Sequence, residues 1–327
     1  MSRLAPVNLF KILVRRMQTE LEQLKERVSR MAALEAEVAR QRVTIEHLEL
    51  ELSRHVSLLR LIAAPQINDT PFARQTRASF DYQWEQLPLG RWNLDHPEFR
   101  KEAAGYVCQF TALPREWFAG KRTLDAGCGA GRYSWAMCTM GAEVLSIDQS
   151  PHGLARTRRA CQEFPAHRTK QVNLLEPLGI DEQFDLVWSF GVLHHTGDTY
   201  GCYQRLAPLV RPGGYLFLML YGEPRRDHVD DYRAVIEYER WRQLTRNLTF
   251  EERLSAVREA MGRKEFMANG EEYVEGYFDA ISPLIADLYS WPEIESWLVR
   301  DGFVDVRRTV DTRNHHVIAR RPATSEA

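Results

Sequence analysis

The sequence lacks the features that define several large classes of protein. It contains no run of about 20 apolar residues, so we expect no membrane-spanning helix. Residues 1–14 lack the apolar core and the small-residue exit of a cleavable signal peptide. The formal net charge of −2 over 327 residues gives the chain no overall attraction to nucleic acid or to acidic membranes, and we expect no nucleic acid as a partner.

Cysteine is also scarce. The five cysteines are odd in number, and none belongs to a C-x-x-C pair. This pattern argues against a disulfide framework and against a structural zinc site, and it is typical of a reducing compartment. The adjacent pair His315 and His316 has no third ligand at a suitable spacing. We therefore expect a cytoplasmic protein without a bound metal.

A third absence is local, because residues 9–62 contain no proline, glycine or tryptophan. Apolar residues recur there at steps of mostly three and four, with charged residues between them. They are Leu21, Leu24, Val28, Met31, Leu34, Val38, Ile45, Leu48, Leu52, Leu59 and Ile62. This heptad-like pattern predicts a coiled-coil helix over residues 1–64 and self-association through it. Two alternatives stay open: a helix packed on its own globular domain, and a membrane-surface helix, which the mixed charges disfavour.

The most informative stretch runs from Thr123 to Arg132 and reads TLDAGCGAGR. A short apolar strand that leads into a glycine turn and then a helix is how α/β proteins build nucleotide sites. Glycine lets the backbone approach a ligand, and the helix N-terminus offers free N–H groups. The spacing G-x-G-x-G fits a dinucleotide pyrophosphate poorly. A second expected strand ends at Asp148, where a carboxylate can accept both ribose hydroxyls of an adenosine.

The stretch from Leu124 to Gly131 resembles motif I of the class I S-adenosylmethionine-dependent methyltransferases, of their small-molecule, UbiE-like type. Asp148 and the later turn Arg211-Pro212-Gly213-Gly214 are similar to that family as well. The resemblance implies an α/β fold, with a Rossmann-like seven-stranded sheet and helices on both faces, here preceded by the long N-terminal coiled-coil helix. It also implies S-adenosyl-L-methionine as the cofactor.

The same resemblance implies the residues that hold the cofactor. In the glycine loop they are Asp125, Gly127, Gly129 and Gly131, which would hold its amino-acid and ribose parts. Asp148 would meet the ribose hydroxyls, Asn173 the adenine, and Ser189 and Phe190 would line the end of the fourth strand. Gln149 and Leu174, which follow Asp148 and Asn173, are also expected to contact the cofactor. Asn173 stands where the family often has an acid, and its side-chain oxygen can still accept from the adenine amine without charge.

Two further groups of residues are candidates for the reaction itself. The pair His194 and His195 resembles a tandem histidine of small-molecule members of the family, and either imidazole can take the proton of an attacking hydroxyl. We expect His195 to be the base, with His194 as the second choice. The alternative is that one histidine only hydrogen-bonds and shapes the pocket.

Residues 79–87 are rich in aromatic side chains and precede motif I. We predict that Tyr82 and Trp84 close over the cofactor, because aromatic faces attract a sulfonium cation and exclude water. Ordinary packing of an N-terminal helix is the alternative. Tyr273, Tyr277 and Phe278 are candidates to face the acceptor in the same way, although aromatic residues at such positions are more often part of a core.

The expected domain organisation has five segments. A coiled-coil helix (1–64) is followed by a linker with an aromatic lid and N-terminal helices (65–112), the cofactor-binding core (113–222), a helical insertion that covers the substrate (223–290), and a last helix with closing strands and tail (291–327). A helical insertion after the fifth strand is where such enzymes often place a substrate cover.

The predicted function is methyl transfer to a small-molecule, sugar or glycan acceptor, with O-methylation favoured. An RNA methyltransferase is the first alternative, disfavoured because Ser189-Phe190-Gly191-Val192 stands where an N-P-P-[YF] type motif would be needed. A non-catalytic scaffold is the second, disfavoured by the intact motif I. The coiled coil leaves room for a partner protein, and the sequence does not identify the acceptor.

Overall fold

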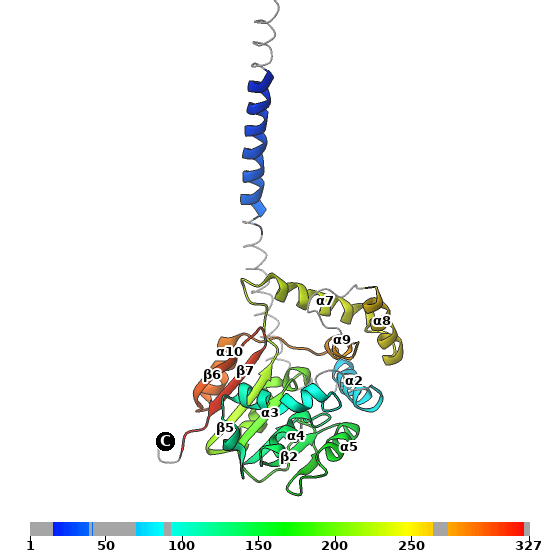
Figure 1. Ribbon diagram of the computed structural model, residues 1–327, viewed down its shortest axis with the longest axis vertical. Coiled ribbons are helices and arrows are strands. Elements are labelled where there is room, and N and C mark those ends of the chain that lie inside the picture. The colour runs from blue at the N-terminus through cyan, green and yellow to red at the C-terminus, as the bar shows by residue number, and fades with distance from the viewer. Residues whose placement is uncertain (1–15, 39–40, 42–69, 88–92, 264–273, 324–327) are drawn as a thin grey trace, which may run out of the picture. The chain divides into compact units, whose positions relative to one another are not determined.

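The computed structural model describes residues 16–38, 41, 70–87, 93–263 and 274–323. The chain divides into two compact units, residues 1–65 and residues 66–327. In the first unit, residues 16–38 form one α-helix in which every residue is exposed (Figure 1). Its apolar stripe is exposed too, with Leu24 59% and Met31 61% accessible. The remainder of the predicted coiled coil lies outside the described residues.

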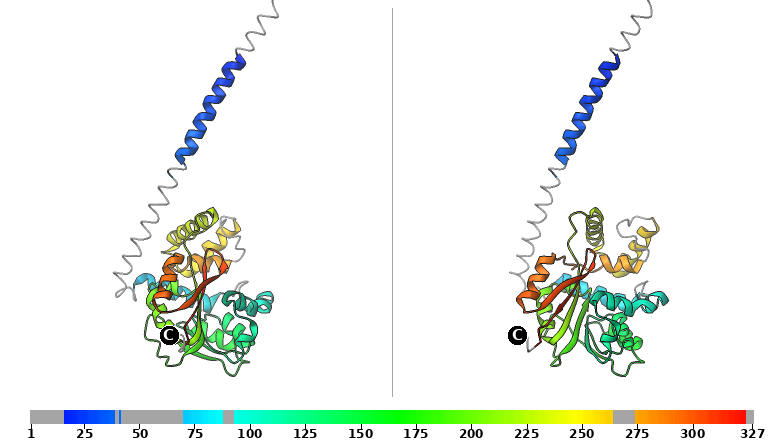
Figure 2. Two further views of the ribbon diagram at one scale, coloured as in Figure 1. Left: turned by 90° about the vertical axis from the view of Figure 1, so that its left-hand side faces the viewer. Right: turned by 60° about the vertical axis from the view of Figure 1, so that its left-hand side comes forward.

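The second unit is built on a seven-stranded sheet with the strand order β3-β2-β1-β4-β5-β7-β6. The strands are β1 (Arg122–Ala126), β2 (Glu143–Asp148), β3 (Arg168–Gln171), β4 (Phe184–Phe190), β5 (Val210–Leu220), β6 (Val304–Asp311) and β7 (His315–Arg320). The first five strands in this order are parallel, and β7 lies antiparallel between β5 and β6, which Figure 2 shows in orange to red. This arrangement confirms the predicted Rossmann-like methyltransferase sheet and the pair of closing strands.

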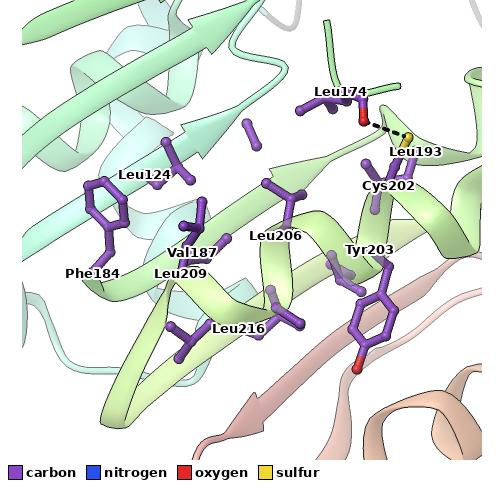
Figure 3. Close-up of a cluster of buried hydrophobic side chains, with 14 of the residues drawn as sticks. Leu124, Leu174, Phe184, Val187, Leu193, Cys202, Tyr203, Leu206, Leu209 and Leu216 are labelled. Atoms are coloured by element: carbon purple, nitrogen blue, oxygen red, sulfur yellow. Dashed lines mark hydrogen bonds between the residues drawn. The ribbon is translucent and has the colours of Figure 1, made fainter. Parts of the chain in front are cut away.

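The central strands are buried on both faces, because successive side chains point to opposite sides of the sheet. In β4, Leu186 and Trp188 enter one hydrophobic core and Val187 enters the other. Helices α3 (Pro97–Thr111) and α4 (Arg132–Thr139) cover the first face, and α6 (Thr199–Leu206) and α10 (Trp291–Arg300) cover the second. Figure 3 shows part of the second core, where Val187 lies among leucine side chains. The two cores fix the strand ends from which the site is built.

The other elements lie around the carboxyl ends of the strands or connect them. Their bounds are α2 (Pro71–Gln86), η2 (Arg115–Phe118), α5 (Pro151–Ala160), η3 (Leu193–His195), η4 (Ala207–Leu209), α7 (Val229–Thr245), α8 (Phe250–Gly262) and α9 (Val274–Ile281). We call α7, α8 and α9 the cap. Thr70 begins α2 by accepting the N–H of Ala73 on its side-chain oxygen, with Pro71 at the first helical position.

The segment that follows α9 ties the cap to α2. The hydroxyl of Ser79 in α2 donates to that of Ser282 at 2.7 Å, and Thr76 accepts the N–H of Ile285 at 3.0 Å. Within the cap, the guanidinium of Arg253 is buried and donates to the backbone carbonyls of Thr245 and Ser282. The segment 282–285 is therefore held by hydrogen bonds from α2 on one side and from Arg253 of the cap on the other.

Candidate active site

A cavity of about 260 Å³ opens at the carboxyl ends of β1, β2 and β4, where open parallel sheets bind ligands. Its wall is formed by the glycine loop, α2, the loop after β4 and α9. Ten of the predicted site residues line it: Trp84, Asp125, Gly127, Gly129, Asp148, Gln149, Asn173, Leu174, Phe190 and His195. Segments far apart in the sequence therefore meet at one site.

The glycine loop needs glycine for two separate reasons. Gly127 and Gly129 have φ of +83° and +52°, a conformation that side chains with a Cβ rarely adopt. The space is occupied as well: a Cβ on Gly129 would lie 2.7 Å from the ring of Trp84. The loop and the aromatic residue of α2 thus pack directly on each other at the wall of the cavity.

Gly131 lies behind the wall and does not line it. It forms the N-cap of α4 with φ of +82°, and a Cβ there would lie 2.9 Å from the backbone of Thr157 in α5. Its position serves the close approach of α4 and α5. Ser189 is also buried behind the wall, where its hydroxyl donates to the carbonyl of Ala126 at 3.0 Å and holds β4 to β1.

Asp148 ends β2 at the cavity, held in a fixed orientation. One carboxylate oxygen accepts the N–H of Gly129 at 2.9 Å, and the other accepts the N–H of Ser150 at 2.8 Å. Burial raises the pKa of this carboxyl, and these hydrogen bonds oppose the shift because they stabilise the charged form. The side chain is therefore an oriented acceptor, as ribose hydroxyls require.

Asp125 lies at the end of β1 and begins a chain of hydrogen bonds. It accepts from the hydroxyl of Ser134 at 2.6 Å; Ser146 donates to Ser134 at 2.7 Å, and Ser146 pairs with the ring of His167 at 2.8 Å. Burial raises the pKa of the Asp125 carboxyl to about 7. Near neutral pH this carboxyl consequently changes charge, and a cation bound beside it favours the ionised form.

The predicted lid residues Tyr82 and Trp84 point in different directions. Trp84 lines the cavity, whereas Tyr82 packs against Phe250 and Phe278 of the cap, with ring centroids 5.2 and 5.9 Å away. Residues i and i+2 of an α-helix are about 200° apart around its axis, so the side chains of Tyr82 and Trp84 cannot both face one ligand. For Tyr82 the structure gives the packing alternative; Phe80 lines the cavity instead.

At the predicted adenine end, Asn173 lines the cavity but its side chain is used in a turn. Its oxygen accepts the N–H of Leu175 at 3.1 Å, and its amide donates to Glu176 at 3.1 Å. Contact of Asn173 with the adenine amine therefore remains a prediction.

The two histidines occupy different environments. His195 lines the cavity, and its Nδ1 lies 2.6 Å from the carbonyl oxygen of Ile285. A carbonyl can only accept, so Nδ1 carries the hydrogen and Nε2 is left with a lone pair. Burial lowers the pKa of His195 to about 4, which keeps the imidazole neutral and able to accept a proton at physiological pH.

His194 lies outside the cavity wall. It is fully buried, stacks on Tyr221 with ring centroids 3.8 Å apart, and accepts the N–H of Tyr221 on Nδ1 at 3.4 Å. Its Nε2 has no hydrogen-bond partner within the described part of the chain. Burial lowers the pKa of His194 well below its usual range. His194 thus packs against Tyr221 outside the cavity wall, and its role as the second-choice base stays a prediction.

Several wall residues were not singled out from the sequence. The charged ones are Arg77, Arg132, Glu275 and Asp279, and Tyr221 adds a hydroxyl. In α9 the aromatic candidates Tyr277 and Phe278 are buried in the cap, 1% and 0% exposed, while Tyr273 lies outside the described residues. The i, i+4 spacing of Glu275 and Asp279 was the available signal, since it places both carboxylates on one helix face.

No group of three or more histidine, cysteine, aspartate or glutamate side chains among the described residues is arranged to hold a metal ion. None of the helices in the described ranges is long and apolar enough to cross a membrane.

Residues 124–216 match the family model described as "Methyltransferase domain". The chain is 34% identical over 134 residues to the ubiquinone biosynthesis O-methyltransferase of Xanthomonas campestris pv. campestris, covering 39% of this chain and 54% of that protein. It is 33% identical over 177 residues to the tRNA U34 carboxymethyltransferase of Idiomarina loihiensis, covering 51% and 54%. The chain spans about half the length of the curated relatives it matches.

Among solved structures, the chain is similar to magnesium protoporphyrin IX methyltransferase from Synechocystis with bound S-adenosylmethionine. That likeness has a TM-score of 0.42 at 17% identity and covers 80% of this chain and 96% of the other. Residues 124–216 of this chain therefore correspond to a methyltransferase domain. The N-terminal helix lies outside the matched residues 124–216.

Proposed function

We propose that the protein transfers a methyl group from S-adenosylmethionine to a hydroxyl of a small-molecule, sugar or glycan acceptor. The observation that carries the proposal is the hydrogen bond from His195 to Ile285, which leaves an unprotonated imidazole nitrogen on a residue of the same wall as the glycine loop. A base beside a cofactor pocket is what a hydroxyl acceptor needs, because an alcohol is a poor nucleophile until its proton is removed.

The residues of the cradle fit the cofactor. Gly127 and Gly129 let the backbone approach a ligand, Asp148 offers an oriented carboxylate for two hydroxyls, and Asp125 offers a carboxylate for an ammonium group. Trp84 presents an aromatic ring at the same wall, which suits a sulfonium cation. We assign the cofactor to these residues, with Gln149, Leu174 and Phe190 completing the wall.

In this proposal the protein aligns the reactants, excludes water and takes a proton. When bound, S-adenosylmethionine would supply the electrophilic methyl group, and its sulfur would keep the electron pair of the carbon–sulfur bond. His195 takes the hydroxyl proton on Nε2 while the acceptor oxygen forms its bond to the methyl carbon. The segment 282–285 holds Nδ1–H and so keeps Nε2 available.

The relative from Idiomarina loihiensis is named for an action on tRNA, which makes RNA the second acceptor class to consider. The near-neutral net charge and the acidic side chains Glu275 and Asp279 in the wall disfavour a polyanionic acceptor. A scaffold without catalysis is disfavoured because the glycine loop, Asp148 and His195 meet at one cavity.

We also propose that the helix at 16–38 associates with a second copy of the chain. Its apolar stripe is exposed along its length, and a stripe of this spacing is buried in coiled coils. Light scattering of Leu24→Glu/Val28→Glu should then show a smaller assembly than wild type, with Gln18→Glu/Gln23→Glu, which adds the same two charges at exposed positions, as the charge-matched control. An unchanged mass would leave a partner protein as the occupant of the stripe. The five free cysteines are consistent with the cytoplasm as the compartment.

The first experiment is calorimetric titration of the protein with S-adenosylmethionine beside Asp148→Ala. We expect micromolar binding that the variant loses, since the carboxylate is an oriented acceptor at the cavity. Absence of binding by the wild-type protein would contradict the cofactor assignment. Production of S-adenosylhomocysteine with sugar acceptors then tests the reaction.

A further inference from the structure

A cationic side chain of the cavity wall lies at the start of the helix that follows the glycine loop. Arg132 is the first residue of α4, directly after the N-cap Gly131, and it lines the cavity. Its guanidinium carbon lies 4.8 Å from the ring centroid of Tyr133 and 5.4 Å from that of Phe190. Both rings line the cavity as well. The charge of Arg132 is therefore placed at the carboxyl end of β4, where Phe190 lies.

The two aromatic rings make the guanidinium of Arg132 a prepared binding group. Contact with an aromatic ring stabilises the cation without using its hydrogen-bond donors, which lie in the plane of the guanidinium. A planar group with fixed donors loses little freedom when it binds a ligand. Such a group pairs best with two oxygens in one plane, as in a carboxylate.

The carboxylate of Asp125 lies beside the same helix turn. It accepts the hydroxyl of Ser134, the third residue of α4, at 2.6 Å, and it lines the same cavity. In the sheet, Asp125 of β1 pairs with Trp188 of β4, two residues before Phe190, whose ring the guanidinium contacts. Burial raises the pKa of Asp125, and the positive charge of Arg132 opposes this shift. An anionic and a cationic side chain thus border one part of the cavity.

The methionine end of S-adenosylmethionine carries a matching pair of charges, because one carbon bears both an ammonium group and a carboxylate. The proposed function assigns the ammonium group to Asp125 and leaves the carboxylate without a partner. A carboxylate that leaves water is costly to bury unless a cation or several donors receive it. A guanidinium meets this need through two parallel N–H···O hydrogen bonds.

The second arginine of the described wall is placed differently. Arg77 lies on α2 and also borders a neighbouring hollow together with Gln149 and Asn173, which we assign or predict to contact the adenosine part of the cofactor. The ammonium group and the carboxylate share one carbon, so the cation for the carboxylate must lie near Asp125. Arg132 belongs to the helix turn that contacts Asp125, whereas Arg77 belongs to another helix.

Resting on the proposed function, we propose that Arg132 binds the carboxylate of the methionine part of the cofactor. Together with Asp125 it makes the cavity selective for a ligand that carries both charges. Two opposite charges on one carbon fix the orientation of the methionine chain, and a ligand with one of them loses this advantage. Arg132 is a binding residue in this inference and takes no proton.

The test compares S-adenosylmethionine with its decarboxylated form. In that form a hydrogen replaces the carboxylate, while the amine, the sulfonium and the adenosine remain. Calorimetric titration of the full-length protein with each ligand gives two dissociation constants and their ratio. The variants are Arg132→Gln and Arg132→Lys, and the matched control is Arg77→Gln, which removes a positive charge from the same wall.

We expect the wild-type protein to bind S-adenosylmethionine about tenfold or more tightly than the decarboxylated form. In Arg132→Gln, affinity for S-adenosylmethionine should fall about tenfold to a hundredfold, because a paired contact with a charged group is lost. Affinity for the decarboxylated form should fall by no more than about threefold, which also shows that the cavity is intact. Arg132→Lys should keep part of the preference, since its charge remains without the planar donors. Arg77→Gln should keep the wild-type ratio.

Three outcomes would overturn the inference: equal binding of the two ligands by the wild-type protein, equal losses for both ligands in Arg132→Gln, or a wild-type ratio in that variant. If Arg132→Gln binds neither ligand, Arg132→Lys decides, and equal affinity for the two ligands there overturns the inference. Collapse of the ratio in Arg77→Gln would overturn it as well, by moving the carboxylate to α2. Failure of the wild-type protein to bind S-adenosylmethionine would instead remove the proposed function on which the inference rests.

Discussion

The Nδ1 nitrogen of His195 lies 2.6 Å from the carbonyl oxygen of Ile285, which is 90 residues further along the chain. This contact fixes the tautomer of the His195 imidazole. The carbonyl comes from a segment outside the sheet, whereas His195 lies in η3, just after strand β4. The carbonyl is presented by a segment that two buried arginines hold, since Arg242 donates to Pro283 and Arg253 donates to Ser282. The orientation of the His195 imidazole therefore depends on the cap as well as on the core.

Replacing the base should separate catalysis from cofactor binding. In His195→Gln, we expect the turnover number to fall by about 100-fold to 10,000-fold, because no base remains to take the proton of the substrate hydroxyl. Affinity for S-adenosylmethionine should change little. Steady-state kinetics and calorimetry measure the two effects, and His228→Gln, at an exposed position, is the control. Wild-type turnover in His195→Gln would exclude the imidazole as the base.

The contact between the glycine loop and α2 should be intolerant of a methyl group. In Gly129→Ala the new Cβ meets Trp84 and the backbone keeps a strained positive φ, which costs about 1–3 kcal/mol. Affinity for S-adenosylhomocysteine should fall about 10-fold to 100-fold. The matched control is Gly105→Ala in α3, where a Cβ meets no atom within 4 Å. Calorimetry in which both variants bind alike would contradict the close packing.

Cofactor affinity should depend on pH through Asp125. Its pKa of about 7 lies above the ordinary value, so the carboxyl of the cofactor-free protein is largely protonated at pH 6 and ionised at pH 8. Because a cationic ligand group favours the ionised form, affinity for S-adenosylmethionine should rise about tenfold between these values. Asp125→Asn should remove this rise. A wild-type affinity that is flat over this range would contradict the shifted pKa.

The same carboxyl gives a signed prediction for stability without cofactor. A folded-state pKa above the unfolded value of 3.8 means that the folded protein holds this proton more tightly. The contribution of Asp125 to the free energy of unfolding is thus fully present below about pH 4 and is lost as the pH rises through 7. As the pH rises from 5 to 8, the free energy of unfolding of Asp125→Asn should therefore increase relative to that of the wild-type protein, as measured by denaturant titrations. A constant difference between the two proteins would contradict it.

Loss of the buried Arg253 should loosen the cap. The residue is 1% exposed, and its removal takes one donor from each of the backbone carbonyls of Thr245 and Ser282. These carbonyls keep the N–H of Leu248 and the side-chain amide of Gln75 as their other donors. We expect Arg253→Met to lower the free energy of unfolding by about 1–3 kcal/mol. Turnover should fall more than cofactor affinity, because the segment that orients His195 is released. Arg263→Met, at an exposed ion pair of the cap, should change stability by less than about 1 kcal/mol.

The fold and the position of the glycine loop and Asp148 at the cavity were predictable from the sequence because they depend on local signals. Gly127 and Gly129 mark a turn that favours glycine, and Asp148 ends an apolar strand. Each position can therefore be recognised from the local sequence, without knowledge of its tertiary contacts. The sheet follows from the alternation of short apolar runs with helices. The same signals placed β6 and β7 as a closing pair.

The acceptor side was less predictable because it depends on which face of a helix is buried. In α9 the aromatic residues and the carboxylates are interleaved, and only the packing of the cap shows that Tyr277 points inward to the core and Asp279 to the cavity. Likewise, Tyr82 and Trp84 are equivalent aromatics until α2 is placed between the cap and the glycine loop. The site of His195 needed a contact 90 residues away.

Helix α2 carries two contacts with different consequences. Trp84 packs on the glycine loop in the wall of the cavity, and Thr76 accepts the N–H of Ile285, the residue whose carbonyl orients His195. A displacement of this helix large enough to free the loop also releases the peptide behind the base. One helix thus links the wall of the cavity at Trp84 to the orientation of the His195 imidazole, so that the two contacts are kept or lost together.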